Sequence, residues 1–186
     1  MILIIKNMVS RRCIMFVENV LNHYGVKYLS VKLGRIEIRD PITESQYTQI
    51  QTALSKSGLD IITDKKKILV ERIKTTIIEL IHYSDKESKI NFSTYLSLKL
   101  NYSYTYLSTV FSDNEGITIE HFIIIHKIER VKELIMYNEL NVSEIACKLH
   151  YSSTAHLSNQ FKKETGVTPS FFRATKEKKL KNLEDL

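Results

Sequence analysis

Residues 143–173 read SEIACKLHYSSTAHLSNQFKKETGVTPSFFR, and this stretch repeats a pattern that begins about 50 residues earlier. Eight identities stand in register between the two copies. They are Tyr102, Ser103, Leu107, Ser108, Phe111, Gly116, Thr118 and Phe122 in the first copy, and Tyr151, Ser152, Leu157, Ser158, Phe161, Gly166, Thr168 and Phe172 in the second. The offset moves from 49 to 50 because one extra residue separates Ser152 from Leu157. The repeat predicts one structural unit that is built twice.

Each copy predicts two short helices joined by a turn. In the second copy, Ile145 and Leu149 are apolar positions one helical turn apart, beside the small Ala146, which allows close crossing of the next helix. The repeated serine, Ser103 or Ser152, can cap the second helix by accepting a backbone N–H bond. This layout predicts a helix-turn-helix, whose second helix can enter the DNA major groove. The alternative is a set of helical hairpins that pack on one another without binding DNA.

Residues 67–178 resemble the complete seven-helix DNA-binding domain of the AraC/XylS family of transcription regulators, almost position for position from Ser143 to Arg173. The resemblance implies an all-α domain of about seven helices with two helix-turn-helix motifs. An amphipathic helix predicted over residues 119–137 would join two reading heads about one helical turn of DNA apart. It implies double-stranded DNA as the partner of a sequence-specific regulator, with RNA polymerase as a further partner.

The resemblance places the recognition helices at about residues 103–112 and 153–163. The candidate DNA contacts on their outward faces are Thr105, Ser108 and Thr109 in the first helix, and Thr154, His156, Ser158 and Asn159 in the second. Asn can read adenine through two hydrogen bonds, and hydroxyls can contact several bases. His156 is also consistent with a packed or solvated helix residue. Neither helix has an Arg on its outward face, and Asp113 and Glu115 follow the first, so we expect sequence readout mainly from the second head and from DNA shape.

Basic residues near the end of the chain are expected to neutralise phosphates. They are Lys162, Lys163, Arg173, Lys176, Lys178, Lys179 and Lys181, the last two within a basic and acidic tail over residues 179–186. Thr168 can cap the last helix, and Pro169 suits its first turn. Cys147 lies beside Ala146, and we expect it to be buried as a small apolar residue.

Residues 1–63 predict a compact α+β unit in the order βαββαβ. A short apolar run over residues 2–6 and an amphipathic face over residues 11–23 predict the first strand and helix. Gly34 separates two alternating runs and marks a hairpin. A second amphipathic helix and a fourth short strand end the unit, and a polar junction of three lysines follows it.

This N-terminal unit resembles the ferredoxin-like heavy-metal-associated domain, whose Met-x-Cys-x-x-Cys motif reads here as Met8-Val9-Ser10-Arg11-Arg12-Cys13. The family's first cysteine is Ser10, and a hydroxyl is a poor ligand for a soft cation. Cys13 is therefore the one remaining candidate metal ligand, and we expect no cofactor. The resemblance implies a sensor or dimerisation module, through which the chain would form a homodimer.

Composition is consistent with a soluble globular protein. The 186 residues carry 27 basic and 21 acidic side chains, a net charge of +6 that by itself identifies no partner. We expect no membrane span, because the chain has no apolar run of the necessary length. Two cysteines provide no disulfide framework, which indicates the reducing cytoplasm. Common catalytic motifs are absent, so we expect no enzyme. The alternatives are a metal-binding or metal-trafficking protein and a DNA-independent adaptor.

Overall fold

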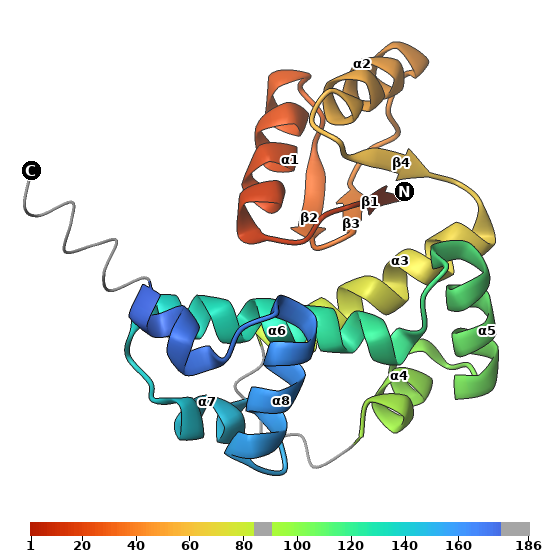
Figure 1. Ribbon diagram of the computed structural model, residues 1–186. Helices are drawn as coiled ribbons and strands as arrows, with labels where there is room; N and C mark the ends of the chain where they lie inside the picture. Colours follow the sequence, from red (N-terminus) through yellow and green to blue (C-terminus); the bar gives the residue numbers. More distant parts are fainter. Residues whose placement is uncertain (84–90, 176–186) are drawn as a thin grey trace, which may run out of the picture. The chain divides into compact units, whose positions relative to one another are not determined.

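The computed structural model describes residues 1–83 and 91–175, and the chain divides into two compact units, Met1–Thr118 and Ile119–Leu186 (Figure 1). The first unit contains β1 (Ile2–Lys6), α1 (Arg11–His23), β2 (Tyr28–Lys32), β3 (Arg35–Ile38), α2 (Glu44–Ser55), β4 (Asp60–Ile62), α3 (Lys65–Ile78), the π-helical turn η1 (Glu79–Tyr83), α4 (Phe92–Leu100) and α5 (Tyr104–Glu115). The second contains α6 (Ile119–Tyr137), α7 (Val142–Lys148), α8 (Thr154–Thr165) and a further helical segment over residues 169–175. The described chain is mostly helical, with one small sheet.

The N-terminal sheet is antiparallel, with the strand order β2-β3-β1-β4. The predicted βαββαβ order of elements is confirmed. Leu3 pairs with Ile36 and Ile5 pairs with Ile61, so these side chains share one face of the sheet. A register shift between Tyr28 and Ser30 interrupts the alternation of β2, which explains why Leu29 is exposed.

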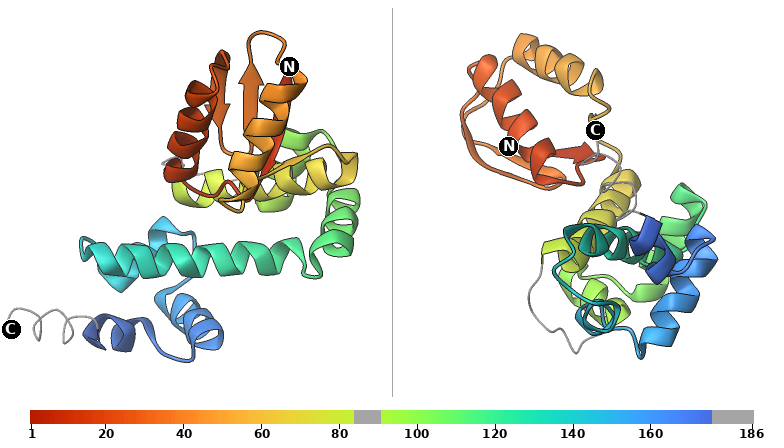
Figure 2. Two further views of the ribbon diagram at one scale, coloured as in Figure 1. Left: turned by 90° about the horizontal axis from the view of Figure 1, so that it is seen from above. Right: turned by 60° about the vertical axis from the view of Figure 1, so that its left-hand side comes forward.

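Helices α1 and α2 cover that apolar face of the sheet (Figures 1 and 2). Their inward faces bury Val17 and Leu21 of α1 and Ile50 and Leu54 of α2. A capping box at Thr43 starts α2, where the threonine hydroxyl accepts the N–H of the third helical residue at 3.2 Å. Side-chain periodicity and caps thus account for this layer.

Helix α3 connects the sheet to the helical part of the first unit. The three lysines of the predicted junction form its first turn, and Asp64 caps it by accepting the Lys67 N–H at 2.9 Å. The hairpin turn at Gly34 lies against this helix, since a Cβ at Gly34 would stand 2.7 Å from Thr75 Oγ1. Only glycine fits this close approach, where φ is also +68°.

The helix that follows the sheet changes its repeat near its end. Leu69, Ile73, Ile77 and Ile81 are buried along it and Leu80 is half-buried, while α3 ends at Ile78 and continues as the wider turn η1. A π-helical turn adds a residue to the repeat and rotates the side chains that follow.

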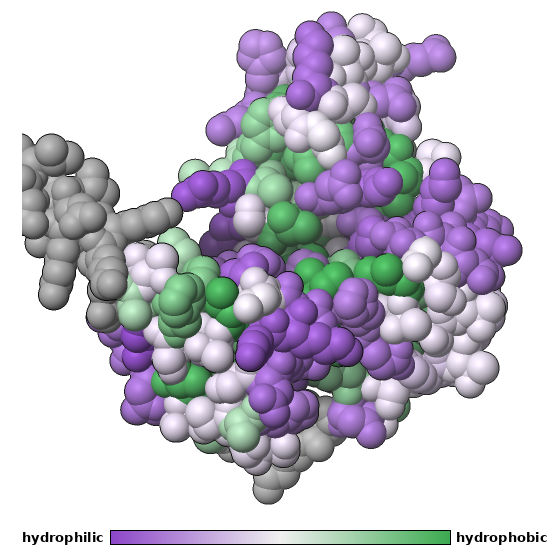
Figure 3. Space-filling view, in the orientation of Figure 1, coloured by the Kyte–Doolittle hydropathy of each residue, from purple (hydrophilic) through white to green (hydrophobic). Residues whose placement is uncertain are grey.

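The second unit is built on α6. Val131 and Ile135 of this helix pack with Ile145, Leu157 and Phe161 in one apolar cluster. On the face drawn in Figure 3, hydrophilic and intermediate residues cover most of the surface, and hydrophobic residues show in separate patches. Within residues 1–83 and 91–175, no helix combines the length and apolar character that a membrane span needs.

Candidate nucleic-acid interface

The first helix-turn-helix consists of α4 and α5. Leu96 and Leu100 of α4 and Leu107 and Phe111 of α5 are buried, which anchors both helices to the core of the first unit. Ser103 caps α5 as expected, accepting the Tyr106 N–H at 3.4 Å. The opposite side of α5 is therefore left to solvent.

The predicted contacts of the first head lie on or beside that exposed side. Thr105 and Thr109 are exposed, and Ser108 is half-buried. The Thr109 hydroxyl donates to the Thr105 carbonyl at 3.0 Å, so its proton is used within the helix while its oxygen can still accept. Glu115 is not a free negative charge near this helix, because Lys74 Nζ lies 2.6 Å from its carboxylate.

Two tyrosines of the first motif were missed from the sequence. The rings of Tyr102 and Tyr106 stack with centroids 5.3 Å apart, and both side chains are nearly half exposed. Tyr106 lies in the first turn of α5, the part of a recognition helix that contacts base edges. The repeat could have indicated Tyr106 as a contact, because at an offset of 50 residues it aligns with His156, a predicted contact of the second head.

The second helix-turn-helix consists of α7 and α8 and packs on α6. Ile145 and Ala146 of α7 are buried with Leu157 and Phe161 of α8. Thr154, a predicted contact, is half-buried, and its hydroxyl donates to Ser143 Oγ at 3.2 Å. This bond joins the starts of the two helices. The expectation that Cys147 is buried is wrong: it is exposed, because the core-facing positions of α7 are taken by its neighbours.

The cap of α8 is one residue later than the repeat suggests. Ser153, and not Ser152, accepts the His156 N–H at 3.1 Å. Ser153 is four residues before Leu157, as Ser103 is before Leu107, so the extra residue of the second copy lies before the cap. Ser152 is thereby released from capping, and its hydroxyl lies 3.0 Å from Nδ1 of His156.

This arrangement holds the imidazole of His156 in place at the start of α8. The ring also packs edge-on against Tyr151, with centroids 5.3 Å apart. His156 and Asn159 are exposed, while Ser158 is half-buried. The structure thus brings two hydrogen-bonding side chains to the outward face of α8, one of them restrained by two neighbours.

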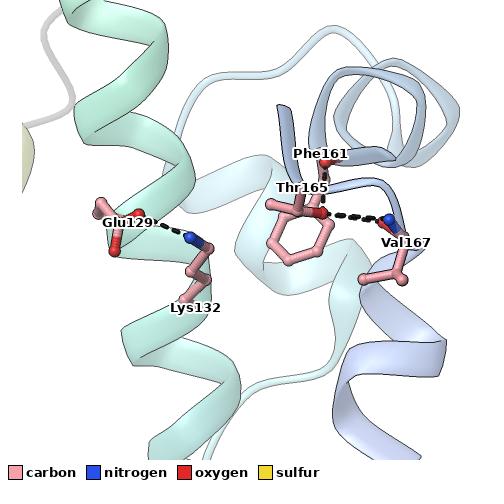
Figure 4. Close-up of polar contacts among 5 residues, drawn as sticks. All are labelled: Glu129, Lys132, Phe161, Thr165 and Val167. Carbon is pink, nitrogen blue, oxygen red and sulfur yellow. Dashed lines mark hydrogen bonds and ion pairs between the residues drawn. The ribbon is translucent and has the colours of Figure 1, made fainter. Parts of the chain in front are cut away.

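The end of α8 carries positive charge. Lys162 and Lys163 are both exposed in its last turn. The helix ends at Gly166, in the left-handed conformation at φ 80°, and Thr165 donates to the Phe161 carbonyl at 2.7 Å beside it (Figure 4). On the neighbouring α6, Glu129 and Lys132 form an ion pair of 2.6 Å. Lys162 and Lys163 therefore lie in the last turn of a helix whose C-terminus is fixed by Gly166 and by the Thr165 hydrogen bond.

Arg173 differs from the other predicted contacts. Thr168 caps the segment over residues 169–175, as expected, by accepting the Phe171 N–H at 3.2 Å. The guanidinium of Arg173 is half-buried and donates to the Leu140 carbonyl at 2.5 Å. Its Nε is buried and finds no hydrogen-bond partner among the described residues. Lys176, Lys178, Lys179, Lys181 and the predicted tail over residues 179–186 lie outside the described residues.

A half-buried lysine supports the turn between α7 and α8. Lys127 of α6 donates to the Leu149 carbonyl at 2.8 Å and lies 5.0 Å from the centre of the Tyr151 ring. Burial lowers the pKa of Lys127, and burial followed by the charge of Glu164 raises the pKa of Tyr151 to about 12. Tyr151 therefore keeps its hydroxyl proton at neutral pH.

Cys13, the candidate metal ligand, lies in the first turn of α1, where Ser10 Oγ is 3.4 Å from its sulfur. Burial alone would raise the pKa of this thiol, but hydrogen bonds from Ser10 and from nearby backbone groups outweigh burial and lower the pKa. In residues 1–83 and 91–175, no three His, Cys, Asp or Glu side chains converge on a position that could hold a metal ion.

These two motifs together define a class of protein domain, a tandem helix-turn-helix domain. A family model described as "Helix-turn-helix domain" matches residues 96–175, from α4 to the last described helix. Among solved structures, the chain resembles the C-terminal domain of AraT, a response regulator from Geobacillus stearothermophilus. The TM-score is 0.51 at 29% identity, over 60% of this chain and 88% of that one.

The chain is also similar to transcription regulators in sequence. It is 26% identical over 157 residues to the uncharacterized HTH-type transcriptional regulator YtdP of Bacillus subtilis (strain 168), a match that covers 80% of this chain and 20% of that protein. It is 31% identical over 100 residues to the F1 operon positive regulatory protein of Yersinia pestis, covering 53% of this chain and 33% of that protein. The chain thus spans between a fifth and a third of the length of these relatives.

Proposed function

We propose that this chain is a sequence-specific DNA-binding transcription regulator of the AraC type, which inserts α5 and α8 into the major groove of duplex DNA. The surface of α8 carries the proposal. It presents His156 and Asn159 outward, anchors its other side through Leu157 and Phe161, and ends in two exposed lysines. The similarity to an HTH-type transcriptional regulator and to the positive regulatory protein of an operon supports the same function.

The two heads have different roles in this proposal. On α8, Asn159 and Ser158 read base edges, His156 is positioned by Ser152, and Lys162 and Lys163 contact phosphates. On α5, Thr105, Ser108 and Thr109 contribute hydroxyls, and the exposed ring of Tyr106 makes an apolar contact in the groove. Because its guanidinium is bound to the Leu140 carbonyl, Arg173 supports the interface by holding the last described helix.

A gel-retardation and footprinting experiment tests the proposal. The chain should protect a specific site, and Asn159→Ala combined with Ser158→Ala should weaken binding to that site by about 1–3 kcal/mol. Gln160→Ala, on the same helix but half-buried, is the matched control and should bind like the parent chain. Absence of any protected site, or equal binding by the double variant, would show the proposal to be wrong.

A salt titration separates phosphate contacts from base contacts. Lys162→Ala should weaken binding to all sequences alike and reduce the slope of log K against log salt by about one unit. Asn159→Ala should leave that slope unchanged, because its side chain carries no charge. A change in specificity from Lys162→Ala would contradict the assigned role.

For the N-terminal part, we propose a ferredoxin-like domain over residues 1–63 that serves as a sensor or dimerisation module, joined to the DNA-binding domain over residues 67–178. The element order and the strand order β2-β3-β1-β4 support this topology. Of the two cysteines of the heavy-metal-associated motif, this chain has only Cys13, with Ser10 in place of the other, so we assign no metal. In this proposal the protein binds DNA in the cytoplasm and has no enzymatic activity. RNA polymerase is its further partner.

A further inference from the structure

A cavity of about 280 Å³ lies within the first unit, between the ends of β1 and β4, the first half of α3 and the last turn of α5. Asp60, Glu71 and Glu115 bring carboxylates to its wall, and Lys6 and Lys67 bring ammonium groups. Its volume is just below the range of about 300–1,000 Å³ that is usual for small-molecule sites. A ligand of this cavity would have the size of a single amino acid.

Glu71 is the residue of the cavity wall whose negative charge is least compensated by its neighbours. Its side chain is 6% exposed, and one carboxylate oxygen accepts the Asn7 N–H at 2.9 Å. The nearest cation, Lys74, is 4.0 Å from Glu71 but 2.6 Å from Glu115, so its charge is directed mainly to Glu115. Burial raises the pKa of Glu71, and Lys74 and the Asn7 N–H offset only part of that rise. A buried carboxylate with incomplete compensation favours a cation in the adjoining space.

The other residues of the wall restrict the kind of cation. A metal ion is disfavoured, because the three carboxylates do not converge in the way a metal site requires among the described residues. An organic ammonium needs fewer ligands, and Val70 offers an apolar surface for a carbon chain. Lys6 and Lys67 are exposed and can hold an anionic group at the opening.

We propose that this cavity binds a small zwitterion of the amino-acid class, with its ammonium group at Glu71 and its carboxylate at Lys6 and Lys67. Asn114 and Glu115, in the last turn of α5, form part of the same wall. The ligand's ammonium at Glu71 adds a positive charge beside Lys74 and so weakens the Lys74–Glu115 ion pair that attaches the first recognition helix to α3. The ligand therefore acts as an effector of DNA binding, a consequence that rests on the proposed function.

Isothermal titration on the full chain tests the site directly. The probes are glycine, 4-aminobutyrate and 6-aminohexanoate, which carry the same two charges at increasing separation. We expect at least one to bind, and butylamine and butyrate, which each lack one charge, to bind at least about tenfold more weakly than 4-aminobutyrate. The site is refuted if no zwitterion binds at concentrations up to about 10 mM, or if butylamine binds as well as 4-aminobutyrate.

Two substitutions locate the binding to this cavity. Glu71→Gln keeps an acceptor for the Asn7 N–H but removes the charge, and it should weaken binding of the best probe at least about tenfold. Lys67→Ala changes an exposed residue and should weaken the probe without affecting folding. Glu129→Gln, on α6 of the second unit, is the control and should bind like the parent chain. Unchanged binding by both Glu71→Gln and Lys67→Ala would refute the site.

Gel retardation with and without the best probe then distinguishes the two proposals. A shift of DNA affinity by the probe that Glu71→Gln abolishes supports the effector role. Probe binding without any DNA retardation would refute the proposed function and leave the zwitterion site standing. Specific DNA retardation without binding of any zwitterion would refute the site alone.

Discussion

The two helix-turn-helix motifs share a core and differ on the surface. Phe111 and Phe161 are fully buried at equivalent positions, and each recognition helix ends at a left-handed glycine. Outside the core, α5 presents a stacked tyrosine pair, whereas α8 presents His156 and two terminal lysines. The repeated residues therefore specify how a head folds, and the residues that differ between the copies specify what it can contact.

The difference at the turn shows how a single residue can change a surface. In the first motif one serine caps α5. In the second, the extra residue provides two serines, of which Ser153 caps α8 and Ser152 contacts His156. An insertion that leaves the core spacing from cap to Leu unchanged thus adds a positioned imidazole to the second head.

The largest effect is expected from the shared core. Phe161→Ala should lower the free energy of unfolding by about 3–5 kcal/mol, because Phe161 is fully buried and packs edge-on against Phe172. Chemical denaturation followed by circular dichroism measures the loss. Phe171→Ala, at an exposed neighbour, should stay within about 0.5 kcal/mol of the parent chain. Equal losses from the two substitutions would contradict the described packing.

The two serines of the second turn should separate stability from recognition. Ser153→Ala should cost about 1 kcal/mol of stability through loss of the α8 cap. Ser152→Ala should leave stability nearly unchanged and should alter DNA affinity through the released imidazole of His156. Paired denaturation and gel-retardation measurements check both. If Ser152→Ala lowered the stability and Ser153→Ala did not, Ser152 would be the cap of α8 and the assignment to Ser153 would be wrong.

The tyrosine pair of the first motif should recognise an apolar feature of DNA. If Tyr106 packs on a thymine methyl group, replacing thymine by uracil within the first half-site should cost about 0.8 kcal/mol, or about fourfold in Kd. The same replacement should have no effect on Tyr106→Ala. Thymine-to-uracil changes that affect both proteins equally would exclude this contact. A loss in Tyr106→Phe at every sequence would indicate a phosphate contact instead.

The smallest effect is expected at Tyr151, whose buried hydroxyl finds no partner in the described part of the chain. Tyr151→Phe removes that hydroxyl and should stabilise the protein by between zero and about 1 kcal/mol at neutral pH. The raised pKa of about 12 means that the folded protein retains a proton the unfolded chain loses near pH 10. Stability should therefore fall between about pH 10 and 12 in the parent chain through this group, and less so in the variant. A loss of more than about 1 kcal/mol in Tyr151→Phe at neutral pH would indicate a hydrogen bond at this hydroxyl.

Much of the fold followed from local patterns. The βαββαβ order, the hairpin at Gly34 and the two helix pairs were all predicted from periodicity, turn residues and caps. Of the four residues of α8 that the resemblance placed outward, His156 and Asn159 are exposed, whereas Thr154 and Ser158 are half-buried. The exposure of Cys147 was missed, since Ala146 and Cys147 are both small and only packing decides which one faces α6.

Repetition and side-chain periodicity in the amino-acid chain were sufficient to establish two helix-turn-helix motifs behind a small α+β unit, because helices, turns and caps depend on residues a few positions apart. Contacts between distant residues came from the three-dimensional arrangement alone. Glu71 meets Asn7 across 64 positions, and Lys74 meets Glu115 across 41. The charges around the cavity, and the neutralisation of Glu115 at the first recognition helix, depend on such contacts. No local pattern predicts them, because partners far apart in sequence become neighbours only when the helices and strands pack.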